Sequence, residues 1–190
     1  MKLIELVLDE DEQVFGVDAI SLVDEPAIER DFVALQKQQV RFKQSGERQV
    51  LMGPALIPDK FIYRRDDDRG EYSVYFSKST VRRASELYLR RNLANSFTKD
   101  HESKVSGIHL TESWIVESDT DKSRQYGFDV PIGTWMVAVK VDDTTLWAEA
   151  VKTGKVRGFS IEGYFVNKMR EQNEQSAMRE VREMVEKIVN

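Results

Sequence analysis

The sequence predicts an α+β protein that is mainly β: a curved antiparallel sheet or a partly closed β-barrel, with two packed helices and a helix at the C-terminus. Segments with strand character outnumber those with helix character along the 190 residues. Several of these segments alternate apolar and polar residues, as strands with one buried face do. Residues 77–92 and 142–154 instead combine polar caps with helical spacing, which adds two helices to the predicted sheet.

The predicted strands run through most of the chain, and short polar stretches separate them. An irregular turn follows the second strand, because Pro26 disfavours a helical conformation at Glu25. A later strand at 50–65 is broken by Gly53-Pro54 and by Pro58, because proline is tolerated in strands only at an edge or a bulge. We expect strands at residues 3–9, within 14–23, near 31–37, within 50–65, and at 71–77, 95–101, 105–117, 134–143 and 157–166.

The helices are predicted from their ends and their apolar spacing. Residues 77–92 begin with serine and threonine caps, and residues 142–154 begin with Asp/Thr and end at Gly154. The last segment repeats apolar residues in steps of three, four and three, which is typical of a coiled-coil or docking seam: Met178, Val181, Val185 and Ile188. We therefore expect one domain over residues 1–168 and an amphipathic C-terminal helix over residues 169–190.

Composition excludes several classes of function. The net charge is −5 with acidic and basic residues interspersed, which argues against a nucleic-acid partner because such proteins usually show a basic stripe. The chain has no cysteine, so disulfides, thiolate zinc sites and a cysteine nucleophile are excluded. No apolar run approaches the roughly 18 residues that span a bilayer. We expect a soluble, intracellular protein with no membrane partner.

The polar residues match no known pattern of a metal or cofactor site. The two histidines, His101 and His109, are eight residues apart and match no zinc-ligand spacing. The acidic run at residues 66–68 lacks the glycine and glutamate positions of a calcium loop. No glycine-rich phosphate loop is present. We expect neither a metal nor a cofactor.

Nucleophilic catalysis by a serine is the chemistry that these residues allow. Ser160 and Glu162 lie two positions apart in "RGFSIEGYFV", so on a strand their side chains share one face, roughly 6–7 Å apart. A serine hydroxyl needs a base, and histidine serves that task near neutral pH. His101 on a neighbouring strand could contact both side chains, with Glu162 orienting the imidazole. Gly158 and Gly163 flank this stretch and would let a substrate backbone approach closely.

The chain resembles a known protein family in the order and spacing of six stretches. The stretches are "GVDAISLVDEPAI", "GPALIPDKFIYRR", "GEYSVYFSK", "DHESKVSGIHLTESWIVE", "PIGTWMVAVKV" and "VRGFSIEGYF". From about residue 15 to 168 the chain resembles the XkdF-type phage serine proteases. These are prohead maturation proteases of tailed phages and defective prophages, and they are distantly similar to herpesvirus assemblin. The resemblance implies a barrel-like β core with flanking helices.

The resemblance also implies a function and its residues. It implies a serine endopeptidase that cleaves phage scaffold and major capsid proteins inside the assembling procapsid, in the cytoplasm of the bacterial host. In this family the catalytic histidine precedes the catalytic serine in the sequence, so the resemblance assigns these roles to His101 and Ser160. Our choice for the third member is Glu162, and the alternatives are Glu112 or a dyad without an acid. Assemblin's second histidine follows its serine, so that role does not pass to His109.

Two alternative functions remain open at this stage. The first is an inactive capsid-assembly or scaffold component with the same fold. The second is a binding module that forms a homo-oligomer through the C-terminal helix. In this family that helix can instead begin a scaffold-like segment that self-cleavage removes.

Overall fold

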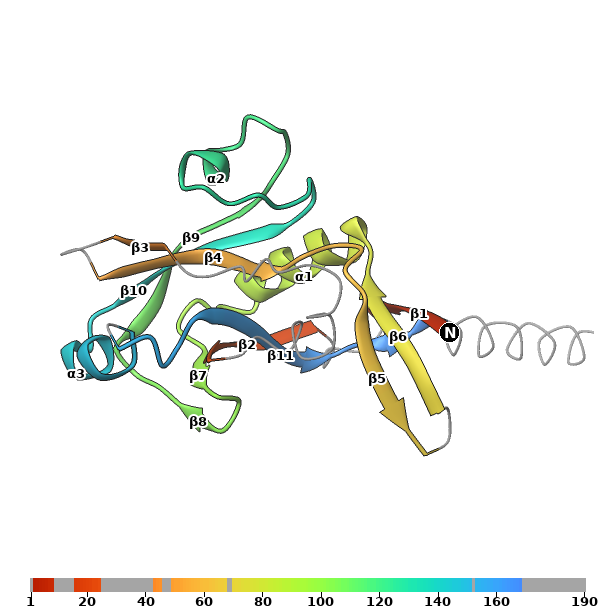
Figure 1. The fold of residues 1–190 in the computed structure, drawn as a ribbon, viewed down its shortest axis with the longest axis horizontal. Coiled ribbons are helices and arrows are strands. Elements are labelled where there is room, and N and C mark those ends of the chain that lie inside the picture. Colours follow the sequence, from red (N-terminus) through yellow and green to blue (C-terminus); the bar gives the residue numbers. More distant parts are fainter. Residues whose placement is uncertain are drawn as a thin grey trace, which may run out of the picture.

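The computed structural model describes residues 2–8, 16–24, 43–45, 49–67, 70–151 and 153–168. These residues are mainly β, as predicted, and they form three four-stranded sheets with few helices (Figure 1). The predicted strand near 31–37 and the predicted helix at 169–190 lie outside the described residues. None of the described helices is long and apolar enough to cross a membrane.

The sheet that carries the candidate site has the order β11-β2-β7-β8. Its strands are β11 (Gly158–Tyr164), β2 (Gly16–Val23), β7 (Phe97–Lys99) and β8 (Ser103–Lys104). Strands from the beginning, middle and end of the described chain thus lie side by side. β2 pairs antiparallel with β11 but parallel with β7.

A second sheet has the order β3-β4-β10-β9, and Figure 1 shows it stacked over the site sheet. Its strands are β3 (Lys43–Ser45), β4 (Val50–Leu56), β10 (Trp135–Val141) and β9 (Ile108–Ile115). β10 lies between β4 and β9 and is buried along most of its length, because its alternate residues pack into two different apolar clusters, one on each face of the sheet.

Only one of the two prolines of residues 50–65 lies in a strand: Pro54 is in β4, whereas Pro58 lies in the turn after β4, where the predicted strand is interrupted. Trp135 pairs with Leu56 and Met136 pairs with Pro54, so Ala55 is an extra residue in β4. Pro54 therefore sits beside a bulge, which confirms one of the two locations that proline tolerates in a strand.

The third sheet has the order β12-β1-β6-β5 and forms the opposite end of the molecule from β3 (Figure 1). Its strands are β12 (Val166–Asn167), β1 (Lys2–Val7), β6 (Gly70–Phe76) and β5 (Ile62–Asp66). β12 follows β11 after a single residue, so the chain leaves the site sheet and enters this one almost at once. β1 pairs parallel with β6.

Three helices accompany the sheets in the described part of the chain. α1 (Lys78–Arg90) is capped by Ser77, as predicted, and packs against β2, β9 and β10. α2 (Lys122–Gln125) lies in the connection between β9 and β10, where the sequence predicted no helix. α3 (Thr144–Leu146) begins after the Asp143 cap and continues as a π-helical turn, Trp147–Val151, so the predicted helix at 142–154 is present but is not regular.

The core lies among these elements and holds their largest apolar side chains. Trp135 of β10 and Tyr88 of α1 are fully buried, and their rings meet edge to face at 5.5 Å between centroids. The Tyr88 hydroxyl donates to the Ser96 carbonyl oxygen at 3.0 Å, so this buried polar group is satisfied. Burial raises the pKa of Tyr88 well above its ordinary value, so it stays neutral.

Two features of the architecture differ from the prediction. A purely antiparallel sheet was expected, but the pairs β1–β6 and β2–β7 are parallel. The described strands divide into three sheets and close no barrel. Alternation of apolar and polar residues reports which face of a strand is buried, whereas it carries no information on strand direction or on which strands become neighbours.

Candidate functional site

The candidate nucleophile lies in β11, on the face opposite the apolar core. Phe159 belongs to the buried core, whereas Ser160 and Glu162 project from the other face. Ser160 pairs with Ser21 of β2, and Glu162 pairs with Ala19. The alternation that the sequence suggested therefore holds, and both polar residues face the same side.

Three hydroxyl residues form a row across the site sheet. Ser160 of β11 pairs with Ser21 of β2, and Ser21 pairs with Thr98 of β7. All three are buried, with exposed fractions of 6%, 0% and 7%. A buried row of polar side chains carries a desolvation penalty unless its members find partners, so this row has a structural or chemical role.

The histidine is presented by the tight turn between β7 and β8. Asp100 and His101 have φ values of 52° and 60°, and the Glu102 N–H donates to the Lys99 carbonyl oxygen at 3.1 Å. Positive φ at both central residues, closed by this bond, is the pattern of a type I′ hairpin turn. Neither central residue is glycine, so the surrounding structure must hold the turn in this conformation.

β2 holds that turn through two main-chain donors. The Asp100 N–H donates to the Leu22 carbonyl oxygen at 3.0 Å. The His101 N–H donates to the hydroxyl oxygen of Ser21, also at 3.0 Å. The backbone of the histidine is thus attached to the same buried serine that lies beside Ser160.

The carboxylate of Glu162 reaches across β2 to the histidine. Its Oε1 lies 3.2 Å from Nδ1 of His101 and also accepts a short hydrogen bond from the Thr98 hydroxyl. β11 and β7 are about 10 Å apart because one strand lies between them. Glu162 pairs with Ala19, and the next residue on that face of β2 is Ser21, so the central strand presents small side chains between the other two.

A bulge and a glycine set the position of Glu162. The pairing shifts between Glu162 and Gly163, so that Gly163 pairs with Val17 and Asp18 is the extra residue of β2. A Cβ atom at Gly163 would overlap the carbonyl oxygen of Gly16. The expectation that Gly163 admits a substrate backbone is therefore wrong, because the β2 backbone already occupies that side of the glycine.

The arrangement contains the histidine–acid half of a Ser-His-acid site. In such a site the acid contacts Nδ1 of the imidazole, and Nε2 faces the serine hydroxyl. His101 and Glu162 meet the first condition, and their side chains are 38% and 30% exposed, so the pair is open to solvent. No hydrogen bond within the described residues joins Ser160 to His101. Catalytic hydrogen bonds are often long without substrate and shorten in the complex.

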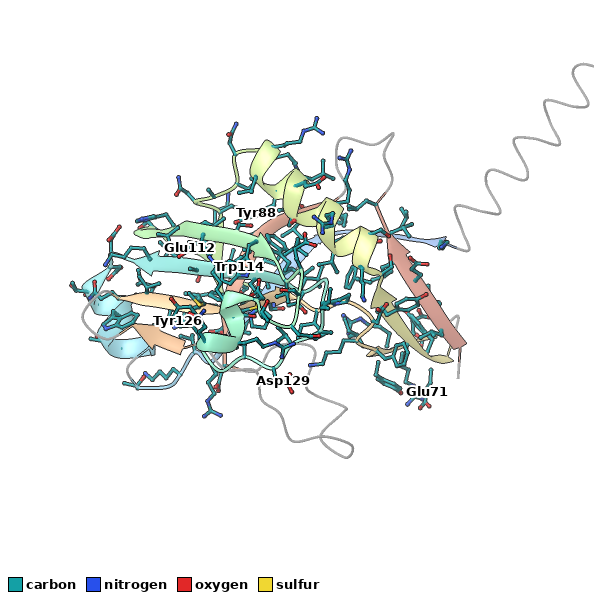
Figure 2. The ribbon with its side chains drawn as sticks, turned by 90° about the horizontal axis from the view of Figure 1, so that it is seen from above. Glu71, Tyr88, Glu112, Trp114, Tyr126 and Asp129 are labelled. Carbon is teal, nitrogen blue, oxygen red and sulfur yellow. The ribbon has the colours of Figure 1, made fainter. Side chains whose placement is uncertain are left out.

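The other two candidates lie elsewhere. Glu112 is on β9 of the second sheet, beside Trp114 (Figure 2), and makes an ion pair with Lys122. His109, also on β9, has its Nδ1 3.2 Å from Asp142 and its side chain is 41% exposed. The geometry therefore brings together His101, Glu162 and the row containing Ser160, and it leaves Glu112 and His109 outside.

Ser21 and Thr98 are the site residues that the sequence reasoning missed. A signal was present: Ser21 is a single serine in the apolar run "AISLV", and Thr98 follows buried Phe97. Their partners come from other strands, so their roles emerge only from the pairing. In the described ranges, no three His, Asp or Glu side chains gather where they could hold a metal ion.

A comparison with family models gives one match. The model described as "Putative phage serine protease XkdF" matches residues 39–168, which is more than half of the chain. The matched segment includes His101, Ser160 and Glu162, but β1 and β2 precede it. No curated protein matches the chain, and no solved structure matches it.

Proposed function

We propose a function on the premise that this match supplies: the chain belongs to the XkdF family of phage serine proteases. The proposed activity is that of a serine endopeptidase of the prohead type, which cleaves scaffold and major capsid proteins while the procapsid matures. The observation that supports it best is the contact of His101 Nδ1 with Glu162, beside the row that contains Ser160. The proposed place of action is the assembling procapsid in the bacterial host.

The proposed mechanism is acyl transfer in two steps. His101 takes the proton of the Ser160 hydroxyl through Nε2 while Oγ forms a bond to the peptide carbonyl carbon. His101 then gives this proton to the leaving amine, the C–N bond breaks, and an acyl-enzyme remains. Water then attacks the ester with His101 again as the base, the bond from the acyl carbon to Ser160 Oγ breaks, and His101 returns the proton to that oxygen. Glu162 stabilises the imidazolium that forms in each step and keeps the ring oriented.

The test is co-expression with the scaffold and capsid proteins of the phage that encodes the chain. We expect specific cleavage products with the native chain and none with Ser160→Ala, because the nucleophile is removed. Ser73→Ala is the matched control, since Ser73 is a fully buried strand serine of β6, outside the site sheet. Cleavage that persists in Ser160→Ala would reject Ser160 as the nucleophile.

A second candidate function is an inactive capsid-assembly component that retains the fold. The observation that favours it is the lack of a hydrogen bond between Ser160 and His101 within the described residues. The same experiment separates the two candidates. Unprocessed scaffold in the presence of the native chain, with normal procapsid assembly, would favour the inactive component.

The proposed homo-oligomer through the C-terminal helix needs its own measurement. Its basis is the seam of Met178, Val181, Val185 and Ile188 in the sequence. A chain that ends at residue 168 should form particles with fewer copies of the chain in solution than the full chain does. Equal oligomeric states for the two chains would exclude the seam as the interface.

A further inference from the structure

Two buried hydroxyl groups lie between the nucleophile strand and the histidine turn, and each contacts one partner of the His101–Glu162 pair. Ser21 is on the central strand β2, and Thr98 is on β7. Both face the same side of the sheet as Ser160, because the three residues share one row. Neither hydroxyl takes part in the acyl-transfer steps described above.

Ser21 acts on the backbone of His101. Its Oγ accepts the His101 N–H at 3.0 Å, and its side chain is fully buried. His101 has a φ of 60°, a conformation that a residue with a side chain adopts only when its surroundings hold it. The hydroxyl of Ser21 thus fixes the point from which the imidazole extends.

Thr98 acts on the carboxylate of Glu162. Its hydroxyl donates to Oε1, the same oxygen that lies 3.2 Å from Nδ1 of His101. A glutamate side chain has several freely rotating bonds, and holding it in one conformation is entropically unfavourable. A hydrogen bond to the charged oxygen from a buried strand residue offsets that entropy and aims the carboxylate at the imidazole.

We propose that Ser21 and Thr98 are positioning residues that hold His101 and Glu162 in the arrangement needed to activate Ser160. This inference rests on the proposed function, because it assigns these hydroxyls a role in that same reaction. Ala19 completes the arrangement, since Glu162 pairs with it and passes over its small side chain. Ala19 and Ser21 belong to β2, which precedes the segment that the family model matches, so the central strand of the candidate site lies outside that segment.

The test measures the rate at which the full chain is labelled by a fluorophosphonate, which reacts with activated serine hydroxyls. In this reaction Ser160 Oγ forms a bond to phosphorus, fluoride leaves, and His101 takes the hydroxyl proton. We expect Thr98→Val to lower the rate about tenfold, as loss of a hydrogen bond to a charged group does. Thr98→Ser keeps the hydroxyl and should retain most of the rate.

A double-mutant cycle tests whether Thr98 acts through Glu162. If it does, the Thr98→Val/Glu162→Ala double variant should be labelled no more slowly than Glu162→Ala alone, because the carboxylate that accepts the Thr98 hydrogen bond has already been removed. Additive effects of the two changes would overturn this part of the proposal. Thr134→Val is the matched control, since Thr134 is a fully buried threonine whose hydroxyl donates to the Pro131 carbonyl oxygen.

Ser21→Ala tests the other hydroxyl. We expect a rate about threefold to tenfold below that of the native chain, since an ordinary hydrogen bond is lost while the side chain becomes only slightly smaller. Ser73→Ala should leave the rate unchanged. The melting temperature of each variant is measured beside its rate, so a variant that loses activity through unfolding is recognised.

The outcomes separate this inference from the proposed function. Labelling that persists in Ser160→Ala rejects the proposed nucleophile, and the positioning roles with it. Labelling that requires Ser160 but is unaffected by both Thr98→Val and Ser21→Ala leaves the protease intact and overturns the positioning roles alone. Rates that fall in Thr98→Val, return in Thr98→Ser and do not fall in Thr134→Val support the inference.

Discussion

The two histidines of the chain share almost the same immediate contact but lie in different surroundings. Each has Nδ1 at 3.2 Å from a carboxylate, Glu162 for His101 and Asp142 for His109. Their side chains are exposed to similar extents, 38% and 41%. A histidine–carboxylate pair alone therefore does not distinguish a candidate site from an ordinary surface ion pair.

The difference lies in what supports each pair. Glu162 is also bound by a buried threonine hydroxyl, and the backbone of His101 is held by a buried serine. The carboxylate of Asp142 is 54% exposed and has a lysine, Lys140, as its other ionic neighbour. Hydrogen bonds with buried hydroxyl residues hold the first pair in one geometry, whereas the further contact of the second pair is a lysine that is itself bound to Gln49.

Replacing each histidine by alanine tests this comparison most directly. We expect His101→Ala to lower the fluorophosphonate labelling rate at least about a thousandfold, because the proposed base is lost. His109→Ala should change the rate by less than about twofold, since exposed ion pairs contribute little to stability and His109 is outside the site. A comparable loss in both variants would show that the supporting hydrogen bonds do not distinguish the pairs.

The glycine beside Glu162 gives a second test, now on stability. Gly163→Ala should destabilise the protein by about 3 kcal/mol or more, because its Cβ would overlap backbone atoms of β2 that cannot move aside easily. Gly70→Ala should be destabilising by only about 1 kcal/mol, since Gly70 has a φ of 67° but open space around it. Urea unfolding measures both, and equal effects would contradict the close approach of β2 to Gly163.

The ion pair between Glu5 and Lys168 gives a third test, and its expected effect is the smallest. The hydrogen bond from Lys168 is the main cause that lowers the pKa of Glu5 from its ordinary value of 4.5. Unfolding raises that pKa again, so the stabilisation is present above pH 4.5 and is lost as the pH falls through the lower folded-state pKa. Lys168→Met should therefore be destabilising by about 0.2–1 kcal/mol at pH 7 and by less at pH 3.

Thermal unfolding of the native chain and Lys168→Met across that pH range measures this difference. Lys122→Met, which removes the partner of Glu112 in the second sheet, is a matched control at another lysine–glutamate pair. A difference between the native chain and Lys168→Met that grows toward acid would contradict the direction of the shift.

Local sequence signals predicted the elements better than their assembly. The Ser77 cap and the alternation in residues 71–77 located α1 and β6, because both signals act within a few residues. The parallel pairing of β2 with β7 depends on chain segments that are about 75 residues apart, and no local pattern encodes it. The α2 turn was missed because its four residues are too few for helical periodicity.

The candidate site, too, was predicted only in part from the sequence. His101, Ser160 and Glu162 were selected from the scarcity of histidine and the alternation in one strand, and the structure brings His101 and Glu162 into contact. Ser21 and Thr98 contribute single hydroxyls whose partners are about 60 to 80 residues away. Such long-range contacts depend on the register of three strands, which the sequence of any one of them leaves undetermined.

The central position of β2 has a consequence for a chain that is made one residue at a time. Ser21 leaves the ribosome about 140 residues before Ser160, its partner in the row of hydroxyl residues. The row therefore forms only after the residues from Ser21 to Ser160 have been synthesised, since pairings between distant segments form late. Such an order of events would keep the proposed protease from cleaving the proteins around it until β11 has paired with β2.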